Sequence, residues 1–85
     1  MKVLIPSALH SYTGKAWVEA NGATLGRVLA DLDRQYPGIR FRMIDEQGKI
    51  RAHIKLFVNA ELQRSLLAPL AVKDEILIVA ALSGG

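Results

Sequence analysis

One segment of the chain has the periodicity of an amphipathic helix, and it limits the possible folds more than any other feature. Thr24 is a good N-cap residue for this helix. Apolar side chains follow it at the three- and four-residue spacing of one helical face, at Leu25, Val28, Leu29, Leu32 and Tyr36. The helix must end at Tyr36, because Pro37 follows and disfavours helical geometry in the residue before it.

Patterns typical of strands lie on both sides of this helix. Branched and alternating residues predict strands over 2–9, 15–20, 54–59, 62–64 and 75–81. A turn over 10–14 joins the first two strands, so we expect them to form a hairpin. Residues 39–44, after the helix, are expected to be irregular or to form a single helical turn. One helix can cover one face of a mixed sheet, so the sequence predicts an α+β fold.

A sheet covered on one face leaves its second face to water or to a partner. If Ile54, Leu56 and Val58 point to the helix, then Phe57 points away, together with Leu77 and Val79 of the last strand. These three side chains would form an apolar outer patch, and such patches often mark interaction sites. We expect this patch to dock a partner; the alternative is that a loop or a second copy of the chain covers it.

The last three residues, Ser83-Gly84-Gly85, directly follow the apolar run 76–82. Frayed tails are usually polar and loosely attached, whereas this one leaves a predicted strand at once. We therefore expect one domain over 1–82 and a short flexible arm over 83–85. The carboxylate of Gly85 is the expected functional group, already terminal without processing, with Leu82 and Ser83 contributing to partner docking beside it.

Composition narrows the function further. The chain has no cysteine, which excludes a disulfide framework, a thiolate nucleophile and a zinc finger. His10 and His53 are isolated, so no metal site is expected. The segment 22–26 is not a phosphate-binding glycine motif, so a partner would have to bind any ATP.

Length and charge point to a small carrier or binding module. Eighty-five residues supply one core but no deep catalytic cleft. The net charge of +3 and the single aromatic in Arg40-Phe41-Arg42 are weak signs of nucleic-acid binding. No run is long enough for a membrane helix, and the start lacks a signal peptide, so we expect a cytoplasmic protein.

Residues 74–85 resemble the end of the MoaD/ThiS sulfur-carrier proteins, which are small ubiquitin-like β-grasp domains finishing in Gly-Gly. Short similarities continue in order through the chain, at Ile5-Pro6, Thr13-Gly14, 22–26, Asp31-Leu32, 36–39, Arg42, Asp45-Glu46 and 57–59, and are strongest with the CysO-type and MoaD-like branch. The resemblance implies a β-grasp fold, in which a mixed sheet of four to five strands is covered on one face by one main helix.

The resemblance also implies a reaction cycle. A partner adenylyltransferase of the MoeB/ThiF type would use ATP and Mg²⁺ to convert the Gly85 carboxylate into an acyl-adenylate, and sulfur would displace AMP to leave a thiocarboxylate. An α-carboxylate with a pKa of about 3.5 is ionised and unreactive at neutral pH, so activation must supply a leaving group. Without side chains, Gly84 and Gly85 fit a narrow tunnel in the partner. The chain itself would be a carrier rather than an enzyme and would bind no cofactor.

The resemblance leaves the sulfur acceptor open. It is compatible with an acceptor of the cysteine synthase type and with the large subunit of molybdopterin synthase, and less so with thiamine or tRNA thiolation. The residues alone leave two other functions open. One is a protein modifier joined through Gly85 to a lysine, and the other is a β-grasp binding module whose tail has no role.

Overall fold

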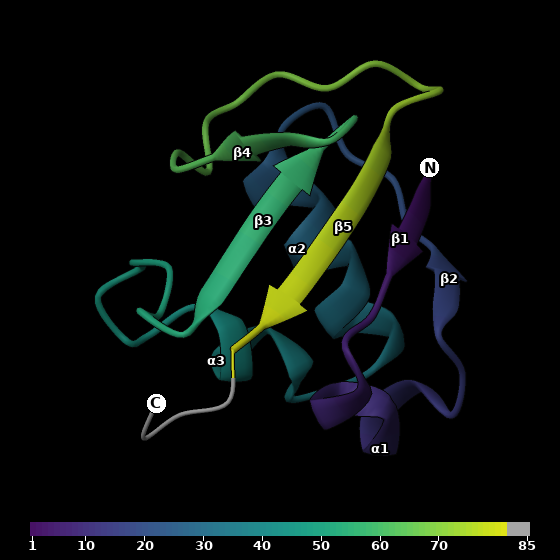
Figure 1. Cartoon of the computed structure of the whole chain (residues 1–85), viewed down its shortest axis with the longest axis vertical. Helices are drawn as coiled ribbons and strands as arrows, with labels where there is room; N and C mark the ends of the chain where they lie inside the picture. Colours follow the sequence, from purple (N-terminus) through teal and green to yellow (C-terminus); the bar gives the residue numbers. More distant parts are fainter. Residues whose placement is uncertain (82–85) are drawn as a thin grey trace.

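The computed structural model describes residues 1–81 and shows a five-stranded mixed sheet packed against one long helix (Figure 1). The strands are β1 (Lys2–Leu4), β2 (Trp17–Glu19), β3 (Ile54–Val58), β4 (Glu61–Gln63) and β5 (Glu75–Ala80). Their order across the sheet is β2-β1-β5-β3-β4; β1 and β5 are parallel, and the other neighbours are antiparallel. The predicted α+β fold, with one main helix on one face of a mixed sheet, is confirmed.

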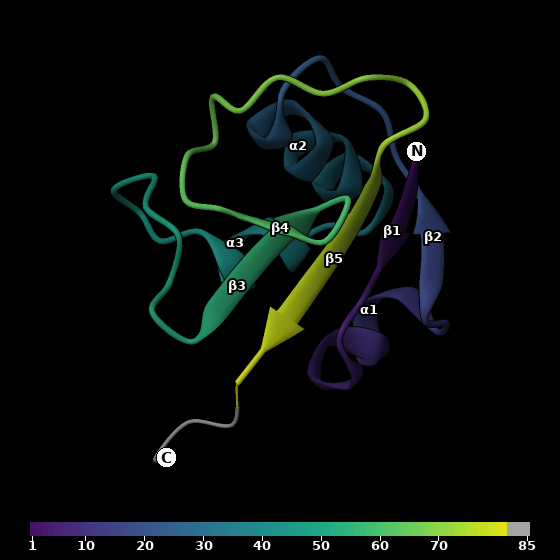
Figure 2. The ribbon, with the colours of Figure 1, turned by 45° about the horizontal axis from the view of Figure 1, so that its top comes forward.

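The main helix is α2 (Leu25–Gln35), which crosses one face of the sheet (Figure 2). The hydroxyl oxygen of Thr24 accepts a hydrogen bond from the Arg27 backbone N–H at 3.3 Å, as the predicted N-cap should. The helix buries four side chains completely, at Leu25, Val28, Leu29 and Leu32. After Pro37-Gly38, the short helix α3 (Ile39–Met43) supplies the single helical turn expected over 39–44.

The core lies between α2 and the inner face of the sheet. Alternate strand residues point into it, at Val3, Val18, Ile54, Leu56, Val58, Ile76 and Ile78. Every buried side chain in residues 1–81 is apolar, so the core needs no internal polar partners. The prediction that Ile54, Leu56 and Val58 face the helix is confirmed.

The opening segment differs from the prediction. The first strand ends at Leu4, although Ile5 still donates its backbone N–H to the Ala16 oxygen at 2.7 Å. Pro6 has no N–H to extend the pairing, and a 3₁₀ turn over Ser7–Leu9 and the short helix α1 (His10–Thr13) follow. The predicted strand over 5–9 and simple turn over 10–14 are therefore wrong, whereas the antiparallel pairing of β1 with β2 is confirmed.

Gly22 lies where a side chain would collide with the start of α2. A Cβ atom built on it would be 2.6 Å from the Val28 nitrogen and 2.7 Å from the Arg27 carbonyl carbon, both backbone atoms. We expect Gly22→Ala to lower the free energy of unfolding by about 1–3 kcal/mol, because backbone cannot yield as a flexible side chain can. Urea denaturation measures the loss. The control is Gly48→Ala, whose Cβ meets open space but whose φ of +78° strains an alanine. A Gly22→Ala chain that is as stable as the wild type would mean that the collision is relieved cheaply.

Candidate functional site

The face of the sheet opposite α2 carries an apolar row that crosses all five strands. Figure 1 views this face, with α2 behind the sheet. Leu4 lies opposite Trp17 on one side and Leu77 on the other, and Phe57 lies opposite Leu77 and Leu62. We call these five side chains the apolar row: Trp17, Leu4, Leu77, Phe57 and Leu62. Side chains in direct cross-strand register contact one another, so the row is a continuous surface.

Solvent reaches this row. Trp17 is 44% exposed and Leu62 38% exposed, while Phe57 and Leu77 are half-buried. Val79 is 43% exposed and lies beside the row, opposite Lys55. The structure thus brings together Phe57, Leu77 and Val79 on the outer face, as the alternation predicts; their docking role stays a prediction.

Charged residues border the apolar row on both sides. Lys2 lies opposite Glu19 in β2 and Glu75 in β5, two residues along β1 from Leu4 and on the same face. Lys55, on the other side, is exposed. An apolar centre within a charged rim is the usual arrangement of a transient protein interface.

The strand β5 leads from this face to the end of the chain, and hydrogen bonds fix it at both ends. The Asp74 carboxylate accepts hydrogen bonds from the Ala71 backbone N–H at 2.7 Å and the Asn59 side-chain amide at 2.8 Å, and these bonds hold the pKa of Asp74 below its usual value. At the other end, the Ala81 N–H donates to the His53 oxygen at 2.8 Å. The chain is therefore anchored to β3 as far as Ala81.

Basic and aromatic side chains surround this end of β5. A hollow of about 530 Å³ is lined by Ala80 and Ala81 together with Ala8, Leu9, Phe41, Arg42, Arg51, His53 and Ile54. Arg42 donates from Nε to the Tyr12 hydroxyl at 3.0 Å, and Arg51 donates from Nε to the Phe41 oxygen at 2.8 Å. Two fixed guanidinium groups thus make the surroundings of Ala81 positive, which favours an acidic segment on any partner that approaches the terminus.

The predicted reacting residues, Gly84 and Gly85, lie outside the described residues, as do Leu82 and Ser83. Within residues 1–81, no cluster of three or more histidine, aspartate or glutamate side chains could hold a metal ion. In the same range, no helix has the length and apolar character needed to cross a membrane.

Sequence reasoning missed three members of the apolar row, namely Leu4, Trp17 and Leu62. Alternation alone gives the face on which a side chain lies within its own strand, but not the residues opposite it in neighbouring strands. The alternation of Trp17 with the buried Val18 was the one signal that could have found the tryptophan.

Comparison with known proteins decides the family. Residues 3–85 match the model of the ThiS family. The chain belongs to the ThiS family. The sulfur carrier protein CysO of Mycobacterium tuberculosis is 37% identical to it over 89 residues, which cover 98% of this chain and 96% of that protein.

Solved structures show the same fold as this ThiS-family chain. The crystal structure of Mycobacterium tuberculosis CysO superimposes with a TM-score of 0.90 at 36% identity, covering 95% of this chain and 98% of that one. CysO in the Amycolatopsis orientalis BexX/CysO complex superimposes with a TM-score of 0.89 at 33% identity, covering 99% of this chain and 98% of that one. SAMP1 from Haloferax volcanii superimposes with a TM-score of 0.81 at 27% identity, covering 100% of this chain and 98% of that one. The predicted β-grasp fold and MoaD/ThiS family are confirmed, and the curated relatives are named as carriers, not as enzymes.

Proposed function

We propose that this chain is a sulfur carrier whose Gly85 carboxylate is converted to a thiocarboxylate that supplies sulfur for cysteine biosynthesis. The observation that carries the proposal is 37% identity, over nearly the whole of both chains, to proteins named sulfur carrier protein CysO. The family match supports it further because it extends through Gly85.

The chemistry requires two steps on the terminal carboxylate. A carboxylate oxygen attacks the α-phosphorus of ATP and releases pyrophosphate, which leaves an acyl-adenylate. A sulfur nucleophile then attacks the carbonyl carbon, and AMP departs with the electron pair of the broken C–O bond. The partner supplies ATP and Mg²⁺, while this chain supplies the carboxylate and a surface that holds it in place.

The outer face of the sheet is suited to holding the terminal carboxylate in place on a partner. The apolar row offers a centre that a partner can bury, and hydrogen bonds hold the chain to β3 as far as Ala81. We propose that a MoeB/ThiF-like adenylyltransferase docks on this row during activation. A relative has been crystallised in a BexX/CysO complex, which supports the idea that such carriers act through assembly with partner proteins.

We propose a cytoplasmic acceptor of the cysteine synthase type, in preference to the large subunit of molybdopterin synthase, because the curated relatives carry the CysO name. Conjugation of Gly85 to lysine is a second candidate. It is favoured by the structural similarity to the archaeal protein SAMP1, a small archaeal modifier protein, at a TM-score of 0.81. Both functions begin with the same acyl-adenylate and differ in the nucleophile that follows.

Mass spectrometry of the intact chain tests the proposal. The purified protein is incubated with a candidate activating enzyme, ATP, Mg²⁺ and sulfide, and fragmentation locates any change. We expect a mass gain equal to the exchange of one oxygen for sulfur, confined to the C-terminal residue. Covalent adducts on lysines of other proteins, with no such exchange, would instead support the modifier.

A further inference from the structure

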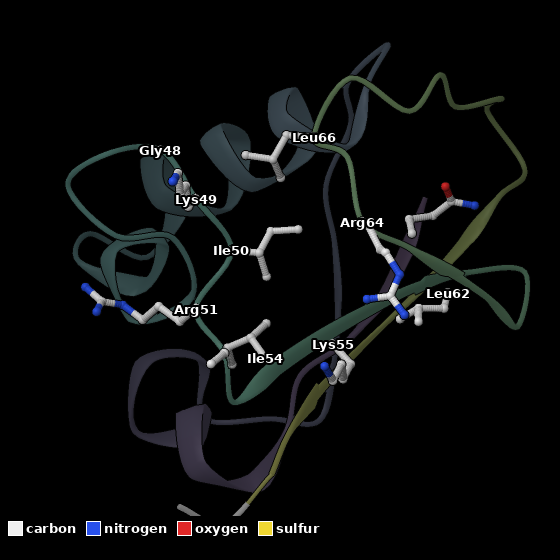
Figure 3. Close-up of a pocket in the computed structure, with 11 residues that line it drawn as sticks. Gly48, Lys49, Ile50, Arg51, Ile54, Lys55, Leu62, Arg64 and Leu66 are labelled. Carbon is white, nitrogen blue, oxygen red and sulfur yellow. The ribbon is translucent and has the colours of Figure 1, made fainter.

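A second hollow, of about 420 Å³, lies at the edge of the sheet (Figure 3). It exists because the pairing of β3 with β4 ends at Leu56 and Gln63. The chain then turns away towards α2, where the Leu66 oxygen accepts a hydrogen bond from the Gly26 N–H at 2.8 Å. The loop 48–52 closes the opposite side. The volume is within the range of small-molecule binding sites, about 300–1,000 Å³.

The hollow has an apolar wall. This wall is formed by Ile50, Ile54, Leu62 and Leu66. Figure 3 shows Ile50, Ile54 and Leu66 pointing towards the space between the loop 48–52 and β4. Ile54 is buried, whereas Ile50 and Leu66 are partly exposed. A ligand with an apolar body would remove more of this surface from water, which is favourable by about 25 cal/mol per Å².

Two positive charges stand on the other wall. Lys55 and Arg64 both line the hollow, and each is one residue beyond the last registered pair of β3 and β4. Both side chains therefore border the same hollow, although the strands no longer pair there. Two like charges that share one site repel each other. A bound anion between them would turn this repulsion into attraction.

Of the other two basic side chains that line the hollow, Arg51 is held by Phe41, and Lys49 is near the carboxylate of Asp45. The Arg51 guanidinium carbon lies 4.6 Å from the centre of the Phe41 ring, and its Nε donates to the Phe41 oxygen. The backbone N–H of Lys49 donates to the Asp45 carboxylate at 3.0 Å, and the positive charges of Arg51 and Lys49 help to lower the pKa of that carboxylate. In residues 1–81 the one ion pair is Arg34 with Asp31, away from the hollow, and no acidic residue lines the hollow.

We propose that this hollow binds a small organic anion, a carboxylate or phosphate carried on an apolar body. The acidic group lies between the Lys55 ammonium and the Arg64 guanidinium, whose planar set of N–H donors matches both kinds of oxyanion. The apolar body rests on Ile50, Ile54 and Leu66. Binding in this hollow would let the carrier also respond to a small acidic metabolite.

Chemical-shift titration of the ¹⁵N-labelled full chain tests this proposal. The probes are phenyl phosphate and phenylacetate, with phenylacetamide as the neutral analogue and inorganic phosphate as the anion without an apolar body. We expect one or both aromatic acids to give saturable shifts over 49–55 and 62–66, and weaker binding of both reference compounds. The tighter of the two acids identifies the preferred anion.

Variants separate a specific site from general attraction to a basic protein. The double variant Lys55→Gln with Arg64→Gln is expected to weaken binding at least about tenfold, because charged hydrogen bonds contribute about 1.5–3 kcal/mol each. The control, Lys15→Gln with Arg27→Gln, removes the same charges from exposed positions that do not line the hollow and should bind as wild type does. Equal affinity for phenylacetamide, equal weakening in both double variants, or no saturable shift with either acid would overturn the proposal.

Discussion

Removal of Gly85 is expected to lower the rate of thiocarboxylate formation by at least about 100-fold. The shortened chain still ends in a glycyl carboxylate, but that group would stop one residue short of the partner's reaction centre. One extended residue spans about 3.5 Å. A displacement of about 1 Å can already cost 100-fold in rate, because the reacting atoms no longer reach a near-attack geometry.

The measurement compares initial rates of the oxygen-to-sulfur mass change in the wild type and the shortened chain. Lys15→Gln is the control, since it alters an exposed residue outside both the terminal arm and the apolar row and keeps the length of the arm and its terminal carboxylate, and it should react at close to the wild-type rate. Urea denaturation should give the same free energy of unfolding for all three chains. A shortened chain that gains sulfur as fast as the wild type would place the reacting group elsewhere.

The fold could be predicted because its main determinants are local. Thr24 and Pro37 mark the limits of α2, and the four buried leucine and valine positions between them occur at helical spacing. Alternation in 54–58 and 75–80 separates residues that face α2 from those that face outwards. These signals need no knowledge of which strands are neighbours.

The candidate site could be predicted only in part, because it depends on register between strands. Phe57 and Leu77 follow from alternation, but the other members of the apolar row come from short strands whose alignment the sequence does not reveal, namely Leu4, Trp17 and Leu62. The hollow at the sheet edge was missed for a related reason. It arises where β4 leaves β3, and no residue type marks the place at which a pairing ends.

A charge at the centre of the apolar row is expected to weaken recognition by the activating partner. Leu77 lies opposite both Leu4 and Phe57, so any partner that covers the row must bury it. Leu77→Asp should lower kcat/KM for thiocarboxylate formation by about 30- to 100-fold, mainly through KM, because central interface residues contribute about 2 kcal/mol or more and a buried carboxylate adds its own cost.

Leu67→Asp is the matched control for this effect. Leu67 is 82% exposed in the connector between β4 and β5, outside the apolar row, so the same substitution there should leave kcat/KM near the wild-type value. Leu77 is only half-buried on the outer face, and the side chains that fill the core from β5 are those of Ile76 and Ile78. The Leu77→Asp chain should therefore still fold, which amide spectra can establish. Equal kinetics in the two variants would show that the partner binds another surface.

A competition experiment distinguishes an effect on partner docking from an effect on the chemical step. A chain without Gly85 keeps the apolar row, so an excess of it should inhibit sulfur loading of the wild type competitively. The same shortened chain carrying Leu77→Asp should inhibit only at much higher concentrations. Its inhibition constant should rise by the same factor by which Leu77→Asp raises KM. If both shortened chains inhibit equally, the partner recognises these chains without the apolar row. If neither inhibits, the terminal glycine itself supplies most of the binding energy, and the sheet face serves another contact.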